Sequence, residues 1–196
     1  MVSNDRGQAH ALEAITAGML LLASVLFALQ VTAVTPLTGS TSSQHIENQQ
    51  ARLAEGVLAA EAENGTVVPT VLYWNESESQ FHGAADDGYH SGGPPTAFGT
   101  VLNQTLRDRN IAFDVNVFYV RENGQRERHS MVDLGSPSDH ASTATRSFTL
   151  YDDDRIRYEN GSAGPPLENA SYFAPDVGPD SRLYNVVELE VVVWRM

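Results

Sequence analysis

The chain has 196 residues, which is the length of one domain or of one domain with a separate anchor. It carries 25 acidic residues against 12 basic ones, and the formal net charge of -13 repels phosphate backbones, so we expect no nucleic-acid partner. Cysteine is absent. Its absence removes disulfide frameworks, thiolate metal sites and cysteine nucleophiles from the functions to consider.

The N-terminal region is dominated by one long apolar segment. Residues 14–46 contain no Asp, Glu, Lys or Arg, and 21 mostly apolar positions lead from Ala14 to Val34. A helix of that length measures about 31 Å, enough to cross a hydrocarbon core of about 30 Å. A cleaved signal peptide has a shorter apolar core, and a buried soluble helix normally keeps a polar stripe. We therefore expect residues 1–8 to form a leader or cytoplasmic tail and residues 9–36 a single transmembrane helix.

The part of the chain beyond this segment carries most of the charge. It has 23 acidic and 11 basic residues, a net charge of -12. The short tail offers only Arg6, offset by Asp5, which gives a weak preference for a cytoplasmic N-terminus. Five Asn-x-Ser/Thr sequons are candidate glycosylation sites and favour an extracellular C-terminal domain; they begin at Asn64, Asn75, Asn103, Asn160 and Asn169.

Two features of the sequence resemble known groups of proteins. All 12 basic residues are arginine, and this acidic, lysine-free composition is similar to that of proteins from extremely halophilic archaea. Residues 6–13, Arg-Gly-Gln-Ala-His-Ala-Leu-Glu, lead directly into the apolar segment and resemble the processing site of type IV prepilins, as found in haloarchaeal pilin-like membrane-anchored proteins. The resemblance implies that a prepilin peptidase cuts between Gly7 and Gln8.

The same resemblance gives Glu13 a role in assembly. In type IV pilins a glutamate near the start of the helix pairs with the amino terminus of a neighbouring subunit, where it also lies at the positive end of the helix dipole. Glu13 would be the sixth mature residue, one position later than the usual glutamate. The alternative is that Glu13 contacts water at the headgroup boundary. The implied partners are the membrane, the peptidase, and copies of this chain or other pilin-like subunits.

A second helix is expected beyond the apolar segment. Pro36 and Gly39 are predicted to interrupt the first helix. Ser42 or Ser43 can then cap a second helix, which carries an apolar face formed by Ile46, Leu53, Val57 and Leu58. We expect residues 37–64 to form this amphipathic stem.

The remaining residues, 65–196, are expected to form an antiparallel β-sheet domain. The pattern predicts a strand over residues 67–74, a surface loop over 75–95, a helix over 96–109, and strands over 111–121, 125–134, 143–151 and 183–194. Asn123-Gly124 predicts a tight hairpin turn. The expected fold class is α+β, with a long N-terminal helix packed on an antiparallel sheet, as in type IV pilins.

No motif predicts catalysis, a cofactor or a metal ion, so we do not expect an enzyme. His82, Asp86, Asp87 and His90 lie close together in sequence, but their spacing matches no metal motif and favours a solvated loop. Serine, histidine and aspartate residues over 129–140 lack a nucleophile-elbow sequence. Several aromatic residues could form a binding surface, although sheet-core packing explains most of them: Tyr73, Trp74, Tyr119, Tyr151, Tyr184 and Trp194.

These observations give two functional hypotheses, beside a third, a membrane-tethered enzyme, which stoichiometric zinc in the purified extracellular domain would support. The first is a single-pass cell-surface structural protein, a pilin-like subunit or pilus-associated component. The alternative is a permanently membrane-anchored surface module that binds another molecule and does not polymerise. Processing of the N-terminus distinguishes them.

Overall fold

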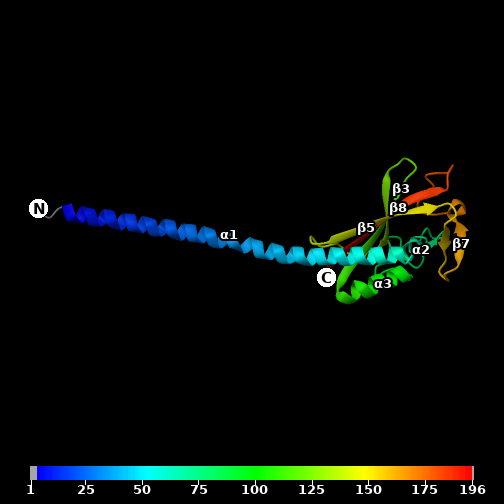
Figure 1. Ribbon diagram of the computed structural model, residues 1–196, viewed down its shortest axis with the longest axis horizontal. Helices are drawn as coiled ribbons and strands as arrows, with labels where there is room; N and C mark the ends of the chain where they lie inside the picture. The colour runs from blue at the N-terminus through cyan, green and yellow to red at the C-terminus, as the bar shows by residue number, and fades with distance from the viewer. Residues whose placement is uncertain (1–3, 196) are drawn as a thin grey trace. The chain divides into compact units, whose positions relative to one another are not determined.

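The structure, a computed structural model, describes the backbone of residues 4–195 and the side chains of residues 10–29 and 44–195. The chain divides into two compact units, Met1–Ile46 and Glu47–Met196. Helix α1, Asn4–Glu63, contributes to both (Figure 1). The helical backbone continues through Pro36 and Gly39, so the predicted interruption was wrong. Proline costs a helix one hydrogen bond and about 3 kcal/mol, a local penalty that the intact turns on either side can outweigh.

The first unit contains the segment that is long and apolar enough to cross a membrane, His10–Leu29, with a mean hydropathy of 2.1. None of this segment is buried by other parts of the chain, which distinguishes it from the core helix of a soluble protein. Its hydroxyl groups bond within the helix, where Thr16 Oγ1 donates to the carbonyl of Leu12 and Ser24 Oγ to that of Leu21, at 3.0 and 2.8 Å. The helix is therefore compatible with membrane anchoring.

A four-stranded antiparallel sheet with the order β4-β3-β8-β5 forms the centre of the second unit (Figure 1). Its strands are β3 (Ile111–Val120), β4 (Arg126–Val132), β5 (Ser142–Tyr151) and β8 (Leu183–Arg195). These strands confirm the predicted ones, because the segments are rich in β-branched and aromatic residues and are bounded by turn signals. The fold class is accordingly α+β with an antiparallel sheet.

One face of the sheet is covered by helices. Phe113, Val115 and Val117 of β3 are fully buried on this face, and the register places them opposite Val193, Val191 and Leu189 of β8. The same core cluster includes side chains from α1, α2 (Val67–Val71) and α3 (Ala97–Thr105), namely Ala54, Val57, Leu58, Val71, Phe98 and Leu102. Of the predicted stem face, Val57 and Leu58 are buried, Leu53 is half-buried and Ile46 is exposed.

Two predicted segments differ from the structure. Residues 67–74 do not form one strand: Val67–Val71 is a helical turn, and only Trp74 begins β1 (Trp74–Asn75). The buried residues Val67, Thr70 and Val71 have helical spacing, and packing on the core outweighs the strand preference of β-branched residues. The expected surface loop 75–95 is not free of structure either, because β2 (Gln80–Phe81) pairs with β1 and Phe81 is buried.

The remaining turns follow local sequence signals. Thr96 caps α3, where its Oγ1 accepts a hydrogen bond from the amide of Gly99 at 3.3 Å. After α3 come a 3-10 turn, Arg107–Arg109, and the β3–β4 hairpin, in which Gly124 has φ 77°. Later in the chain, β6 (Arg155–Arg157) pairs with β7 (Ala163–Pro166) and is followed by a second 3-10 turn, Leu167–Asn169.

Candidate functional site

An aromatic cluster lies on the helix-covered side of the sheet beside β4. Trp74 is at its centre, with ring centroids of Phe81, His129 and Phe173 at 5.4, 5.3 and 5.1 Å. The imidazole of His129 stacks on Phe173 at 4.7 Å with the planes only 9° apart. Burial lowers the pKa of His129, so the ring is neutral in this cluster near neutral pH.

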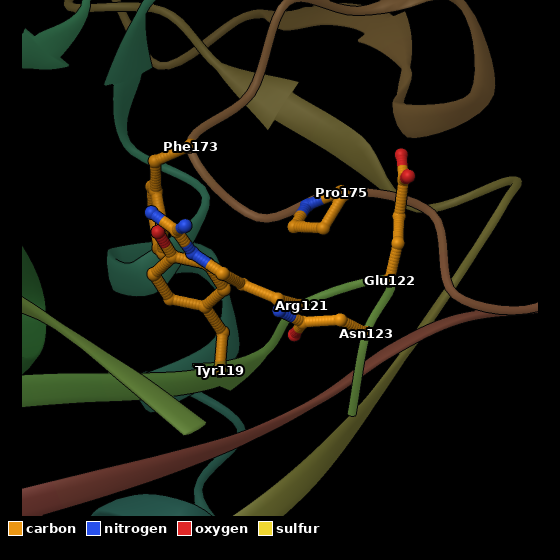
Figure 2. A pocket seen from close by; sticks show the side chains of 6 residues that line it. All are labelled: Tyr119, Arg121, Glu122, Asn123, Phe173 and Pro175. Carbon is orange, nitrogen blue, oxygen red and sulfur yellow. The ribbon is translucent and has the colours of Figure 1, made fainter. Parts of the chain in front are cut away.

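A surface pocket of about 360 Å³ opens next to this cluster. Figure 2 shows its lining, which comes from the β3–β4 hairpin and from the segment after η2 (Leu167–Asn169): Tyr119, Arg121, Glu122, Asn123, Phe173 and Pro175. The rings of Tyr119 and Phe173 lie 5.4 Å apart and join the pocket to the cluster. The pocket therefore combines an apolar wall with charged and amide groups from a turn.

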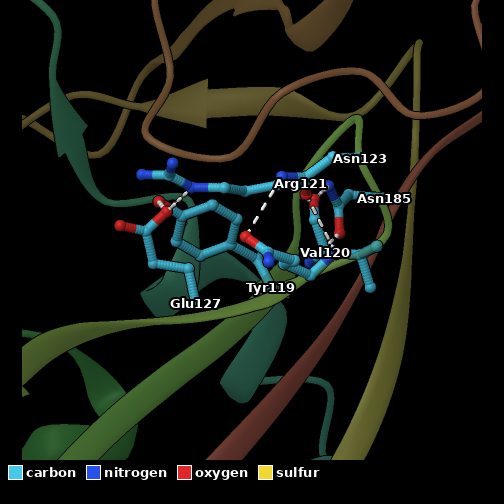
Figure 3. A network of polar contacts seen from close by, with 7 residues as sticks. Tyr119, Val120, Arg121, Asn123, Glu127 and Asn185 are labelled. Carbon is cyan, nitrogen blue, oxygen red and sulfur yellow. Dashed lines mark hydrogen bonds and ion pairs between the residues drawn. The ribbon is translucent and has the colours of Figure 1, made fainter.

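A polar network fixes the hairpin side of the pocket (Figure 3). Glu127 accepts a hydrogen bond from the hydroxyl of Tyr119 at 2.9 Å and forms an ion pair with Arg121. Arg121 and Tyr119 lower the pKa of Glu127, whereas burial and the same carboxylate raise the pKa of Tyr119. Glu127 is thus ionised and Tyr119 protonated at neutral pH, which keeps this hydrogen bond and ion pair formed.

Asn185 joins the two segments that form the pocket. Its fully buried amide donates to the carbonyls of Val120 and Pro175, both at 2.8 Å, and accepts from the amide of Val120 at 3.1 Å. Asn185 comes from β8, at the point where the regular pairing of β8 with β3 has ended, after Phe118↔Glu188. The side chain satisfies backbone groups that the sheet no longer pairs, and thereby positions Pro175 beside the hairpin.

The lining offers groups that are suited to binding a ligand. Two rings and a proline offer an apolar surface, while the guanidinium, carboxylate and amide groups can form directional hydrogen bonds. Arg121 is half exposed and already paired with Glu127, so a ligand with an amide could bind at this rim while that ion pair stays formed.

The residues predicted for processing and assembly lie in α1. Gly7 and Gln8 belong to its first turns, and their side chains lie outside the described residues. Glu13 is 80% exposed and lies 3.7 Å from the imidazole of His10. This exposure leaves the Glu13 carboxylate accessible to another molecule.

The five sequons differ in accessibility. Asn64, Asn160 and Asn169 are exposed, whereas Asn75 and Asn103 are half-buried. Asn103 lies on α3, and its Oδ1 accepts from the amide of Gly93 at 2.9 Å. The side chain of Asn160 accepts from Ser162, which leaves Nδ2, the atom to which a glycan attaches, without a hydrogen-bond partner among the described residues.

The histidine and acidic residues considered in the sequence do not form one group. His90 bonds to Asp87 at 2.7 Å, while His82 packs against Tyr73 at a ring distance of 4.9 Å. Among the described residues there is no group of three or more His, Asp or Glu side chains that could hold a metal ion. His140 pairs with Glu47 at 2.6 Å, and His129 is in the aromatic cluster, so the two histidines of residues 129–140 have separate partners.

The pocket was not found from the sequence. Tyr119 was noted only as an aromatic residue of the sheet, and Arg121, Phe173 and Pro175 were not singled out. The segment containing Phe173 follows a proline-rich stretch whose sequence shows no periodicity. The only available signal was the charged turn next to the best predicted strand.

Comparison with known proteins gives one result. No curated protein and no solved structure matches this chain. One family model matches residues 6–193, and it therefore includes the apolar part of α1 as well as the sheet domain. The chain belongs to this family, which is described as a family of unknown function, DUF7288.

Proposed function

We propose that the protein is a cell-surface structural protein, a pilin-like subunit or pilus-associated component with an N-terminal membrane helix and an acidic extracellular domain. The observation that carries the proposal is the His10–Leu29 segment, whose large apolar side chains are more than half exposed; they include Leu12, Met19, Leu20, Leu21, Leu22 and Phe27. Such a surface needs lipid or other helices around it.

The prepilin-like sequence implies that the helix lies in lipid before assembly. After assembly the same helix would pack on the helices of other subunits. Small residues at four-residue spacing, Ala14 with Gly18 and Ser24 with Ala28, favour close helix approach. A Cβ added at Gly18 meets no heavy atom within 4 Å, so nothing in this chain requires glycine there. Glu13, exposed near the start of this segment, is the group that would pair with the amino terminus of a neighbouring subunit.

The experiment that tests the proposal is mass spectrometry of the intact protein from its native membrane. We expect a mature chain that begins at Gln8, and we expect Gly7→Leu to leave the longer precursor in the membrane. Gly18→Ala is the matched control, because it changes a glycine of the same helix without touching the cleavage site and should be processed normally. A wild-type chain that keeps Met1–Gly7 would contradict prepilin-type processing.

Processing alone does not establish assembly, so a second measurement is needed. The mature protein should appear in filaments sheared from the cell surface, and Glu13→Gln should reduce that fraction while processing and membrane insertion stay normal. Recovery of all processed wild-type protein as membrane-bound monomer would contradict the structural role.

A second candidate function is supported by the pocket at the β3–β4 hairpin. A permanently anchored module needs a binding surface, and the pocket lined by Tyr119, Arg121 and Phe173 has the mixed apolar and polar lining of one. An uncleaved leader, together with a monomeric protein in the membrane, would favour this module over the filament subunit.

A further inference from the structure

Strand β5 forms one edge of the central sheet. It is the last strand of the order β4-β3-β8-β5 and pairs with β8 on one side only. Its ten residues include no proline and a single charge, Arg146, and its register shift falls at its end, between Leu150 and Tyr151. Proline, several charges or a bulge in the middle of a strand are the usual means of protecting an edge against further pairing. The sequence of β5 is therefore compatible with pairing to another strand.

The hydrogen bonds of neighbouring β3 residues show which backbone groups of β5 face the open edge. The amide and the carbonyl of Val120 both bond to Asn185 of β8, whereas the amide of the next residue, Arg121, bonds to Gln125 on the β4 side. This direction alternates along antiparallel strands, so the registers direct the even-numbered residues of β5 toward β8. The odd-numbered residues direct their amides and carbonyls outward: Thr143, Thr145, Ser147 and Thr149.

These outward groups are accessible and unpaired. All four residues are exposed, and no hydrogen bond from another described residue reaches their backbone amides or carbonyls. The opposite edge differs. There Tyr89 forms a bridge to β4, donates to the carbonyl of Met131 at 2.9 Å and accepts from the amide of Asp133 at 3.0 Å. The chain thus covers part of its β4 edge, whereas the β5 edge offers free donors and acceptors to an added strand.

The charges of β5 suit a second copy of the same strand. No acidic residue lies between Asp139 and Asp152, although the chain has 25. Two copies can therefore meet along β5 without opposing carboxylates, in spite of the net charge of -13 on each chain. Arg146 is exposed and forms no ion pair with another described residue, so its guanidinium is available to the partner strand.

One antiparallel register of two β5 strands is self-complementary. When Ser147 of one copy lies opposite Ser147 of the other, Arg146 of each copy lies opposite Phe148 of the other. In this register Thr145 lies opposite Thr149, and both belong to the residues whose backbone groups point outward. A register centred on Arg146 would instead place the two guanidinium groups opposite each other, which is unfavourable.

The sheet already contains a cross-strand contact of arginine with phenylalanine. The guanidinium of Arg126 on β4 lies 3.7 Å from the centroid of the Phe118 ring on β3. The same attraction between a cation and a ring would act twice between two β5 strands, once on each side of the two-fold axis. Phe148 is half-buried and lies on the same face of the sheet as Arg146, as this contact requires.

We propose that two copies of this chain associate edge to edge through β5, in the antiparallel register centred on Ser147, so that their two four-stranded sheets become one continuous sheet. This interface lies in the sheet domain. It requires neither cleavage at Gly7 nor contacts of the apolar helix, and it is therefore independent of the proposed pilin-like function.

Disulfide cross-linking of the full chain in detergent tests the register, because the natural chain has no cysteine. Ser147→Cys places its thiol next to the two-fold axis, with the two Cα atoms about 5.5 Å apart, a separation that suits a disulfide. Thr145→Cys is the matched control on the same face of the strand, since its counterpart lies more than about 13 Å away. Mild oxidation should give a covalent dimer for Ser147→Cys, none for Thr145→Cys, and a dimer again when Thr149→Cys is added to Thr145→Cys.

A second measurement uses no cysteine. Sedimentation in density-matched detergent gives the dimer fraction, and thermal unfolding is measured for each variant. Ser147→Pro removes an outward amide but no bond to β8, so it should abolish the dimer and leave the fold intact. Arg146→Ala should weaken dimer formation about tenfold, because both contacts with Phe148 are lost. Arg128→Ala removes an exposed arginine of β4 and should dimerise as the wild type does.

The outcomes that would overturn the proposal are specific. Equal cross-linking of Ser147→Cys and Thr145→Cys would indicate random collision within a micelle, and no dimer of Ser147→Cys would exclude the register. Association that persists in both Ser147→Pro and Arg146→Ala would place the contact elsewhere in the chain. Hydrogen exchange of protein in its native membrane tests for another occupant: protected outward amides of β5 without a Ser147→Cys dimer would assign this edge to a strand of a different protein.

Discussion

The two units contain the same apolar residue types but differ in whether these side chains are exposed or buried. Leu20 in the first unit is 72% exposed, whereas Leu189 in the second is fully buried between neighbouring strands. The second unit covers its apolar side chains with its own helices and sheet, whereas no part of the His10–Leu29 segment is buried in the part of the chain that the structure describes. The hydrophobic effect favours burial of apolar surface in both units. The second unit buries this surface by folding, whereas the first needs lipid or other helices to bury it.

This difference has a thermodynamic consequence. The free energy that keeps the sheet domain folded is internal to it, and substitutions in its core should lower its unfolding free energy. Substitutions in the apolar segment should leave that free energy unchanged and alter partition into a membrane. Each of the following experiments tests one side of this separation.

The largest expected effect comes from charges in the apolar segment. The double substitution Leu21→Asp with Val25→Asp places two carboxylates in the span, at a cost of about 5–7 kcal/mol for membrane insertion. We expect the protein to move from the membrane pellet to the soluble or aggregated fraction after an alkaline carbonate wash. Leu21→Ala with Val25→Ala is the control and should remain in the pellet; retention of the Asp variant there would disprove a membrane span.

The next largest effect is expected in the core of the sheet domain. Phe113→Ala removes a fully buried ring from the central strand β3 and should lower the unfolding free energy by about 3–5 kcal/mol. Denaturant unfolding of the full chain in detergent, followed by tryptophan fluorescence, measures this loss. Val186→Ala, at a position 41% exposed on the same sheet, should change stability by less than about 0.5 kcal/mol. Similar losses for the two variants would contradict the described core.

A smaller loss is expected at Asn185. Asn185→Ala leaves backbone groups of Val120 and Pro175 without their partner and should cost about 2–3 kcal/mol. Hydrogen exchange should show the loss first at residues 173–177 and at the β3–β4 hairpin. Glu122→Ala, on the exposed turn of the same hairpin, is the matched control. If both variants exchange alike, Asn185 does not hold the two segments together.

The smallest expected effect is on the pH dependence of the unfolding free energy. Because burial lowers the pKa of His129 in the folded state, the unfolded chain binds more protons as pH falls below about 6.5, and the unfolding free energy should decrease there. His129→Phe should flatten this slope between about pH 6.5 and 5, as measured by thermal unfolding.

His90 provides a control of opposite sign for this experiment. The hydrogen bond to Asp87 raises the pKa of His90, so its contribution is present below about pH 6.5 and is lost as pH rises through the folded-state pKa. His90→Gln should therefore leave the acid-side loss in place. Unchanged pH dependence in His129→Phe would show that another group causes the slope.

The strands of the central sheet could be predicted because their signal is local. Ile111, Phe113, Val115, Val117 and Tyr119 alternate with residues of the other face, and β8 repeats this pattern, so both were identified from the sequence. The short elements were missed for the opposite reason. Val67–Val71 is helical because tertiary packing buries Val67, Thr70 and Val71 together. A five-residue segment has too little periodicity to show this in advance.

The candidate sites show the same division. The sequons and the residues around Gly7, Gln8 and Glu13 could be named from the sequence because each is a short contiguous motif. The pocket at β3–β4 brings Arg121 next to Phe173, and the packing of the domain brings the ring of His82 within 6.4 Å of that of Tyr158. These pairs are about 50 and 76 residues apart in the chain, and no local pattern connects them.

The sequence by itself determined the apolar segment, the acidic charge, the main strands and the antiparallel hairpin at Asn123-Gly124, because composition, periodicity and turn chemistry act between near neighbours. Only the tertiary structure decided that the helix continues through Pro36, that His129 stacks on Phe173 and that the Asn185 amide bonds to both Val120 and Pro175. These features depend on long-range packing, in which the burial of a group is set by residues far away in the chain.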